Sequence, residues 1–232
     1  MPRPPRADYA GGIYHALNRG NLRATIFHKQ EDYLAFEKIL GEGLERYEIE
    51  LFSYQLMPNH FHLVLRPAVD GEMGRFMKWV VGTHTMRYHA HYKTGGQGHV
   101  YQQRFKSFPV QDDEHFIALC RYVERNALRA KLVKKAEDWQ YGSLWRWLQK
   151  PPVKPRLLSK WPIPRLPSWT TRVNKALTEA ELAAIRTSTQ RSRPLGSDDW
   201  VHATAKQFGL ESTLRPRGRP KRIDSANDSK ET

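Results

Sequence analysis

The 232-residue sequence contains a single cysteine, Cys120, which excludes a disulfide framework and a cysteine-rich zinc site. Such sparse cysteine usage is typical of a cytosolic protein. No run of about 18 apolar residues is present, so no membrane-spanning helix is expected. Residues 1–6 lack the apolar stretch of a signal peptide, and no internal repeat is found. Hydrophobic residues nevertheless make up 39% of the chain, which suffices for a core and excludes wholesale disorder.

Positive charge is in excess, because 38 Lys and Arg stand against 24 Asp and Glu and give a formal net charge of +14. Residues 1–150 carry +6 of this charge (22 basic against 16 acidic residues), and residues 151–232 carry +8 (16 against 8). This balance indicates a polyanionic partner, with nucleic acid the first candidate and an anionic membrane surface the second. No strongly amphipathic basic helix accompanies the charge, which disfavours the membrane surface.

Six prolines lie between Pro151 and Pro167, where neither a helix interior nor a central strand is expected. The sequence therefore predicts a compact domain over residues 1–150, a proline-rich linker over 151–170 and a basic C-terminal region over 171–232. In that last region, capping signals predict two short helices, at about residues 178–187 and 197–208. The polar end of the chain is expected to be a disordered tail.

Strand and helix signals alternate within residues 1–150. Short apolar or alternating runs predict strands, and apolar residues at helical spacing predict helices. In chain order we expect a strand at 13–17, a helix at 31–46, a hairpin of strands at 50–57 and 60–66, a helix at 72–92, a strand at 100–110 and a helix at 113–129. This order, β-α-β-β-α-β-α, predicts an α+β domain whose antiparallel sheet carries its helices on one face.

The most informative short motif is His60-Phe61-His62 in the second strand of the expected hairpin. Side chains two apart on a strand point to the same face about 7 Å apart, so the two imidazoles can converge on one metal ion. Phe61 would then point into the core. The alternative is that both histidines are simply solvated on a half-exposed strand, since the spacing alone is not specific.

A second candidate pair, Tyr122 and Asn126, lies four residues apart in the expected helix at 113–129 and therefore faces one way. An asparagine offers a carbonyl oxygen to a metal ion, and a tyrosine offers a phenol that can act as a nucleophile. Taken alone, Tyr122 is more simply a core aromatic and Asn126 a polar residue near a helix end.

Together these residues resemble the single-tyrosine transposases of the IS200-like group, whose HUH motif matches Met57 to Leu65 (Met-Pro-Asn-His-Phe-His-Leu-Val-Leu). The resemblance extends in the expected order to residues 14–21, 100–107 and 121–130, and covers nearly all of residues 9–147. One departure is Ala127, where the family often has proline. Residues 193–197 and 214–220 further resemble the REP-associated branch, whose members are lone chromosomal genes in bacteria.

The resemblance implies a ferredoxin-like (RRM-like) catalytic core that cuts single-stranded DNA beside the hairpins of repetitive palindromic elements. It implies that His60, His62 and Asn126 hold Mg²⁺ or Mn²⁺, and that Tyr122 forms a 5′-phosphotyrosine and leaves a free 3′-hydroxyl. It implies no small-molecule cofactor, and a monomer or homodimer associated with the nucleoid in the bacterial cytoplasm. Two imidazoles favour Mn²⁺ through ligand softness, whereas cellular abundance favours Mg²⁺, and Zn²⁺ is a further alternative.

Candidate DNA contacts combine cations and polar groups near these motifs. In the domain they are Asn18, Arg19, Arg104 and Lys106. In the tail, residues 216–220 (Pro-Arg-Gly-Arg-Pro) have the form of an AT-hook, in which Arg217 and Arg219 would enter an A·T minor groove. The alternatives are ordinary solvated charges in the domain and non-specific attraction to phosphates in the tail.

Two other classes of function compete with a hairpin-specific nuclease and strand transferase. One is a non-catalytic DNA- or RNA-binding protein derived from a transposase, which would need none of the four motif residues. The other is a metal-dependent RNA-processing enzyme on the same kind of fold, which would not need Tyr122. The intact set of His60, His62, Tyr122 and Asn126 favours the DNA enzyme.

Overall fold

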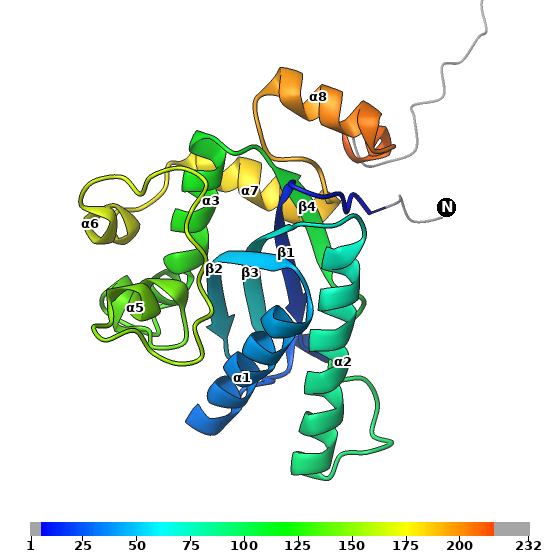
Figure 1. Cartoon of the computed structure of the whole chain (residues 1–232), viewed down its shortest axis with the longest axis vertical. Coiled ribbons are helices and arrows are strands. Elements are labelled where there is room, and N and C mark those ends of the chain that lie inside the picture. Colours follow the sequence, from blue (N-terminus) through cyan, green and yellow to red (C-terminus); the bar gives the residue numbers. More distant parts are fainter. Residues whose placement is uncertain (1–5, 216–232) are drawn as a thin grey trace, which may run out of the picture.

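The structure, a computed structural model, describes residues 6–215 and centres on one four-stranded antiparallel sheet (Figure 1). Its strands lie in the order β2-β3-β1-β4. Their bounds are β1 (Ile13–Arg19), β2 (Ile49–Met57), β3 (His60–Pro67) and β4 (Lys106–Val110). The β2–β3 hairpin turns at Pro58 and Asn59, with Met57 paired to His60, as the sequence predicts. The element order and the α+β class are therefore confirmed.

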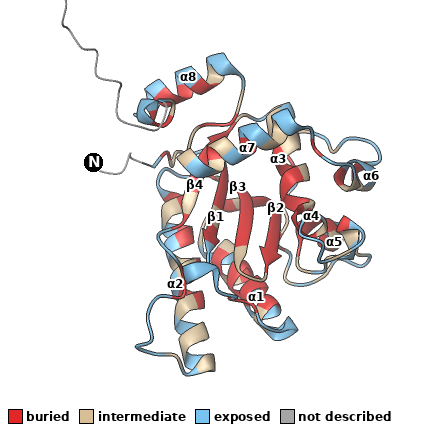
Figure 2. Cartoon of the chain, turned by 180° about the vertical axis from the view of Figure 1, so that it is seen from behind, coloured by how far each residue is buried: buried red, intermediate tan, exposed pale blue. Residues whose placement is uncertain are grey.

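One face of the sheet packs against α1 (Gln30–Arg46) and α2 (Glu72–Tyr92). Phe61, Leu63 and Leu65 point from β3 into this layer and are fully buried with residues of both helices. Alternation along β3 thus builds the first hydrophobic core, because every second side chain of a strand shares a face. Figure 2 shows the strands of the sheet as largely buried, whereas α1 and α2 carry buried, intermediate and exposed segments.

The opposite face is also covered, and here the prediction of helices on one face is wrong. Val64 of β3, Phe52 of β2 and Phe108 of β4 join a second core with α3 (Glu114–Glu124) and α6 (Trp169–Asn174). The physical reason is that these strands carry apolar residues on both faces, so both faces must be buried.

Two predicted elements are shorter than expected. The strand at 100–110 begins only at Lys106, although Tyr101 forms an isolated bridge to Gly20. The helix at 113–129 divides at Arg125 into α3 and α4 (Asn126–Arg129), although backbone hydrogen bonds continue across the division, from the amide of Arg125 to the carbonyl of Arg121 (3.0 Å) and from that of Arg129 to Arg125 (2.9 Å).

The C-terminal region contains the two predicted helices, α7 (Glu179–Arg191) and α8 (Asp198–Gln207). Thr178 and Glu181 form the expected capping box of α7, and Ser197 caps α8. Further short helices complete the chain: η1 (Asn21–Arg23), η2 (Ala136–Asp138), α5 (Ser143–Leu148) and η3 (Glu211–Thr213). The expected disordered tail and the AT-hook residues Arg217 and Arg219 lie outside the described residues.

The proline-rich segment packs onto the domain. Leu157 is buried in the first core and Trp161 in the second, and the Trp161 indole donates to the Phe52 carbonyl (2.8 Å). The amide of Ser159 donates to the carbonyl of Leu51 (2.8 Å) beside β2. The domain boundaries at residues 150 and 170 remain a prediction, but residues 151–170 contribute to both cores.

The C-terminal region also reaches the other edge of the sheet. Leu195 pairs in parallel with Val110 at the end of β4, its amide donating to the carbonyl of Pro109 (2.9 Å) and its carbonyl accepting from the amide of Gln111 (2.9 Å).

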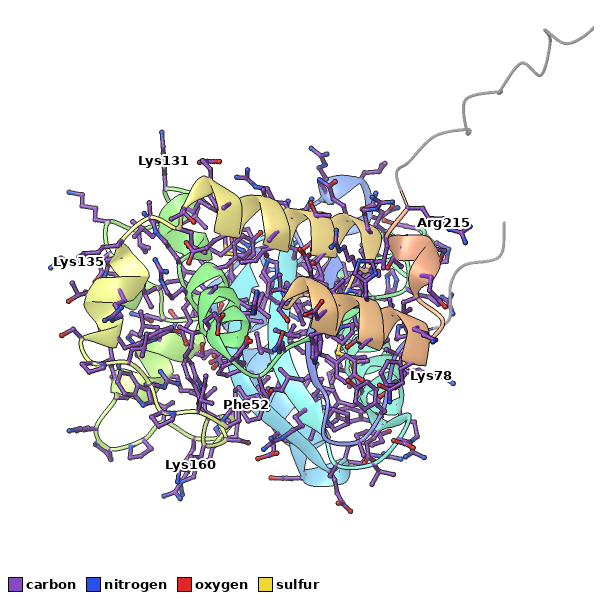
Figure 3. The ribbon with its side chains drawn as sticks, turned by 90° about the horizontal axis from the view of Figure 1, so that it is seen from above. Phe52, Lys78, Lys131, Lys135, Lys160 and Arg215 are labelled. Carbon is purple, nitrogen blue, oxygen red and sulfur yellow. The ribbon has the colours of Figure 1, made fainter. Side chains whose placement is uncertain are left out.

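Seen from above, Lys131, Lys135 and Lys160 extend outward from the periphery (Figure 3). Among the described residues, no helix combines the length and apolar character needed to cross a bilayer.

Candidate active site

The two histidines of the HUH motif lie together on the face of the sheet that α3 covers. In the β1–β3 register His62 is opposite Leu17 and His60 opposite Arg19, so all four side chains share that face. The imidazole centroids are 5.0 Å apart with an interplanar angle of 84°. His62 is buried and His60 is half-buried. The spacing argument therefore places the two rings correctly.

The α3–α4 segment brings Tyr122 and Asn126 to the same place. The Asn126 amide Nδ2 donates to His62 Nε2 (2.8 Å), and the Tyr122 ring lies edge-on to the His62 ring at 6.0 Å. Both residues are buried, with Tyr122 7% exposed. Arg129 Nη2 donates to Asn126 Oδ1 (3.0 Å), and its guanidinium lies 5.3 Å from the Tyr122 ring centroid. All four motif residues thus meet.

His15 of β1 also belongs to this cluster, and sequence reasoning missed it. Its imidazole stacks on His62 at 5.0 Å and 15°, and the two rings share a hydrogen bond between His15 Nε2 and His62 Nδ1 (2.9 Å). Because Asn126 donates to His62 Nε2, the neutral His62 ring carries its proton on Nδ1 and donates to His15. In the sequence, His15 alternates with Leu17 and Arg19, which indicates that the three side chains share one strand face. Only the β1–β3 register shows that this face also carries His62.

The surroundings keep these imidazoles neutral. Burial lowers the pKa of His60 to about 3, with the cations Arg19 and Arg129 adding to the effect. Burial also lowers the pKa of His15 to about 3. The pKa of His62 is lowered by burial first and then by the charges of its neighbours, His60 foremost. A neutral imidazole keeps a lone pair for a metal ion at any pH near neutrality.

The hydrogen bonds direct both lone pairs to Nε2. His60 Nδ1 donates to Asn59 Oδ1 (2.6 Å), and His62 Nδ1 donates to His15, so each Nε2 atom is the acceptor of its ring. Together with the Asn126 carboxamide, these two atoms form a nitrogen and oxygen donor set of a kind that fits a divalent metal ion. A bound ion would compete with the Asn126 amide for His62 Nε2.

A different cluster, formed by Asp113, Glu114 and His115, also brings potential metal ligands within reach of one another. Asp113 Oδ1 accepts hydrogen bonds from the backbone amide (2.9 Å) and Nδ1 (2.8 Å) of His115. These bonds cap the N-terminus of α3, which explains the cluster without an ion.

Tyr122 lines a pocket of about 270 Å³, and His60 and His62 are not among the residues that line it. Three predicted DNA contacts, Asn18, Arg19 and Lys106, line it. The fourth, Arg104, is exposed in the loop before β4 and does not line it. The remaining lining residues are Leu17, Gln102, Gln103, Arg186, Thr189 and Gln190. Sequence reasoning did not find the last three, because nothing local to α7 shows that it lies beside Tyr122.

Two other tyrosines near the motifs, Tyr54 and Tyr101, are buried in the cores and use their hydroxyls in hydrogen bonds there. The Tyr54 hydroxyl donates to Glu37 Oε1 (2.6 Å), and Tyr101 is hydrogen-bonded to His84 Nδ1 (2.7 Å). Burial raises the pKa of both phenols well above their ordinary value. Tyr122 is thus the tyrosine that combines a pocket with the histidine and asparagine cluster.

Comparison with known proteins adds family information to this geometry. Residues 9–126, just over half of the chain, match the family described as "Transposase IS200 like". The chain belongs to the IS200-like transposase family. This transposase has the fold of a solved REP-associated tyrosine transposase bound to a REP hairpin, with a TM-score of 0.52, 16% identity, and coverage of 63% of this chain and 84% of that one.

A second solved structure, a putative transposase from Deinococcus radiodurans R1, gives a TM-score of 0.39 at 18% identity, covering 54% of this chain and 97% of that one. No curated protein matches the transposase significantly. The family assignment confirms the resemblance carried by the HUH motif, and the first structural match confirms the ferredoxin-like α+β fold.

Replacement of His15 tests its role as a positioning residue in this transposase. His15→Phe keeps a stacked ring but removes the acceptor for His62 Nδ1. If the protein acts on hairpin DNA with Mn²⁺ held at His62, we expect about tenfold more Mn²⁺ to be required for half-maximal activity. His15→Gln, which offers an amide oxygen, should recover part of the loss. An unchanged Mn²⁺ requirement with a lowered melting temperature in EDTA would assign His15 to packing alone.

Acidification should destabilise the transposase. The pKa values of His15 and His60 are lowered to about 3 and that of His84 to about 4, so below pH 6.5 the unfolded chain binds more protons than the folded one. Stability is therefore full above pH 6.5 and falls toward those values, by about 2 kcal/mol per imidazole at pH 5. Thermal denaturation in EDTA at pH 7.5 and 5.0 measures this loss.

A matched control is His99→Gln, which removes an exposed imidazole and should leave the pH dependence unchanged. A melting temperature that does not fall between pH 7.5 and 5.0 would contradict burial of neutral imidazoles.

Proposed function

We propose that this transposase is a metal-dependent single-stranded DNA endonuclease and strand transferase. It acts at hairpin-forming repetitive palindromic elements through a 5′-phosphotyrosine intermediate. The observation that carries the proposal is the contact of Tyr122 with the hydrogen-bonded His62–Asn126 pair. Membership of the IS200-like family and the fold shared with a transposase bound to a REP hairpin support DNA as the substrate.

In the proposed reaction the phenolic oxygen of Tyr122 forms a bond to the scissile phosphorus and gives up its proton. The bond from phosphorus to the 3′ oxygen breaks, and that oxygen takes a proton to become a 3′-hydroxyl. His60, His62 and Asn126 would hold the divalent ion, which supplies positive charge against the phosphate oxygens. Phenolate is a better leaving group than an alkoxide, so a DNA 3′-hydroxyl can reverse the step and join strands.

Arg129 positions two of these groups. Its guanidinium donates to Asn126 Oδ1 and also lies beside the Tyr122 ring, so one cation orients the amide and contacts the nucleophile. The residue itself is exposed and adds positive charge at the mouth of the site. This arrangement supports an anionic substrate.

The proposal is tested by incubating the protein with labelled single-stranded hairpin DNA and Mn²⁺. A band that resists denaturation and contains both protein and label is the expected result. Cleavage without a covalent band would favour the metal-dependent RNA-processing type of chemistry. A retarded but uncut band would favour the alternative, a non-catalytic DNA- or RNA-binding protein derived from a transposase.

A further inference from the structure

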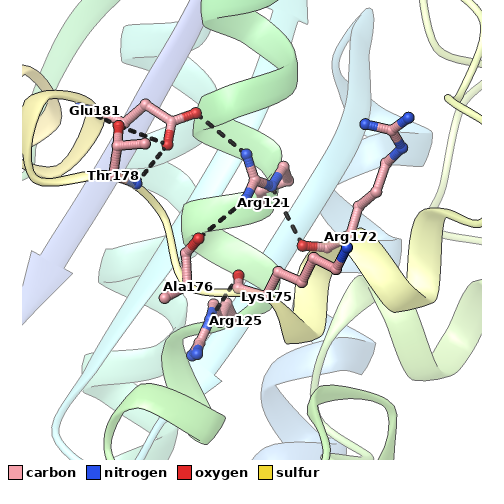
Figure 4. Close-up of polar contacts among 7 residues, drawn as sticks. All are labelled: Arg121, Arg125, Arg172, Lys175, Ala176, Thr178 and Glu181. Atoms are coloured by element: carbon pink, nitrogen blue, oxygen red, sulfur yellow. Dashed lines mark hydrogen bonds and ion pairs between the residues drawn. The ribbon is translucent and has the colours of Figure 1, made fainter.

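The helix α7 is anchored directly to the helix that carries Tyr122. Arg121 of α3 pairs with Glu181 of α7 (3.1 Å) and donates to the carbonyls of Arg172 (3.3 Å) and Ala176 (3.4 Å), which precede α7 (Figure 4). Arg125 donates to the carbonyl of Lys175 (3.0 Å) in the same connection. These contacts hold α7 in a fixed position relative to the nucleophile.

On the other side of α7, two side chains complete the pocket beside Tyr122. Arg186 and Thr189 lie three residues apart, share one face of the helix, and line the pocket opposite the end of β1. Ile185, four residues before Thr189, is 1% exposed and belongs to the second core. Thr189 therefore lies at the edge of the buried face of α7, whereas Arg186 is exposed beside it.

The pocket is lined by cationic residues from three separate parts of the chain. Arg19 ends β1, Lys106 begins β4 and Arg186 lies on α7. A pocket lined by charges of one sign concentrates ligands of the opposite sign, so this lining favours an anion.

The chemistry of the lining selects the ligand. The guanidinium groups of Arg19 and Arg186 and the ammonium group of Lys106 all donate hydrogen bonds, and all three are positively charged. Such a set fits an anion with several acceptor oxygens, as a phosphodiester group provides. We infer that this pocket binds a backbone phosphate of the single DNA strand next to the scissile one, with Arg186 and Thr189 of α7 as its C-terminal wall.

This inference rests on the proposed function only in taking single-stranded DNA as the ligand. It gives α7 a specific contact beside the nucleophile. The experiment uses the full chain in EDTA, where no metal-dependent chemistry proceeds, with fluorescein-labelled d(T)15 as the probe and fluorescence anisotropy as the readout.

Arg186→Gln should weaken binding about tenfold at 100 mM salt and reduce the magnitude of the salt slope by about 0.7, the share of one phosphate in a single strand. Thr189→Val should leave the slope unchanged, since it removes no charge. Arg191→Gln is the matched control, because it removes one charge from the same helix outside the pocket, and it should leave the slope unchanged.

Three results would overturn the inference. Equal losses of DNA affinity for Arg186→Gln and Arg191→Gln would show that both arginines act only through the overall positive charge of α7. An unchanged affinity for Arg186→Gln would show that Arg186 binds no phosphate in this pocket. An equal loss on the uncharged methylphosphonate analogue of d(T)15 would show that the contact is not to a phosphate.

The outcome is separable from the test of the proposed function. A protein that forms no covalent band with hairpin DNA but shows the Arg186 salt effect lacks the proposed activity and retains the phosphate pocket. A protein that forms the covalent band while Arg186→Gln binds normally has the activity without this pocket contact.

Discussion

Tyr122→Phe is expected to abolish the covalent protein–DNA complex and to reduce DNA cleavage by on the order of 10³-fold or more. The substitution removes only the hydroxyl that we propose attacks phosphorus, while the buried ring can keep its edge-on contact with His62. The affinity for hairpin DNA should change little, since we expect the phenol to take part in the reaction and not in binding of the strand. Gel electrophoresis under denaturing conditions and anisotropy measure the two effects separately.

Tyr88→Phe is the matched control, because Tyr88 lies on α2, across the sheet from α3, and bonds His28 instead of the motif residues. It should leave the covalent complex intact. Formation of a covalent complex by the Tyr122→Phe protein would assign the nucleophile to another residue and remove the basis of the proposed mechanism.

Truncation after Lys150 is expected to prevent stable folding. The second core would lose Trp161, Trp169 and Val173 among others, all nearly or fully buried. Deletion of a buried tryptophan side chain alone costs about 3–5 kcal/mol, and a domain is stable by only about 5–15 kcal/mol. Circular dichroism and thermal denaturation should therefore show a strongly destabilised or unfolded chain.

A chain that ends at Arg215 provides the control for this truncation. It keeps every contact described above and removes only residues 216–232, which include Arg217 and Arg219. It should fold normally, and a smaller salt dependence of its DNA binding would support the basic tail as a general phosphate contact.

Cooperative unfolding of the 1–150 chain at the melting temperature of the full protein would contradict a core that residues beyond 150 help to form.

Local patterns were sufficient for much of the fold and for the motif residues of the site. Alternation along residues 60–66 predicts which side His60 and His62 share, and a spacing of four predicts that Tyr122 and Asn126 face one way. That these two pairs meet was implied only by the family resemblance, because strand and helix periodicity do not fix the packing of α3 on β3.

Features that depend on distant parts of the chain could not be predicted. His15 joins the site through the β1–β3 register, and Arg186 and Thr189 reach the pocket through the Arg121 contacts to the α6–α7 connection. The covering of the second sheet face could not be predicted for the same reason. The helices that cover it come from residues 114–191, and their apolar positions do not show which surface they pack against until the sheet is assembled.

The coverage of both sheet edges limits how two copies of this chain can associate. The segment at Leu195 occupies the outer side of β4, and on the β2 side Ser159 and Tyr141 bond the backbone of Leu51 and Leu56. Open strand edges are the usual sites at which sheets join across subunits. At these positions a second copy could pair with the sheet only after displacing the segment that already bonds there.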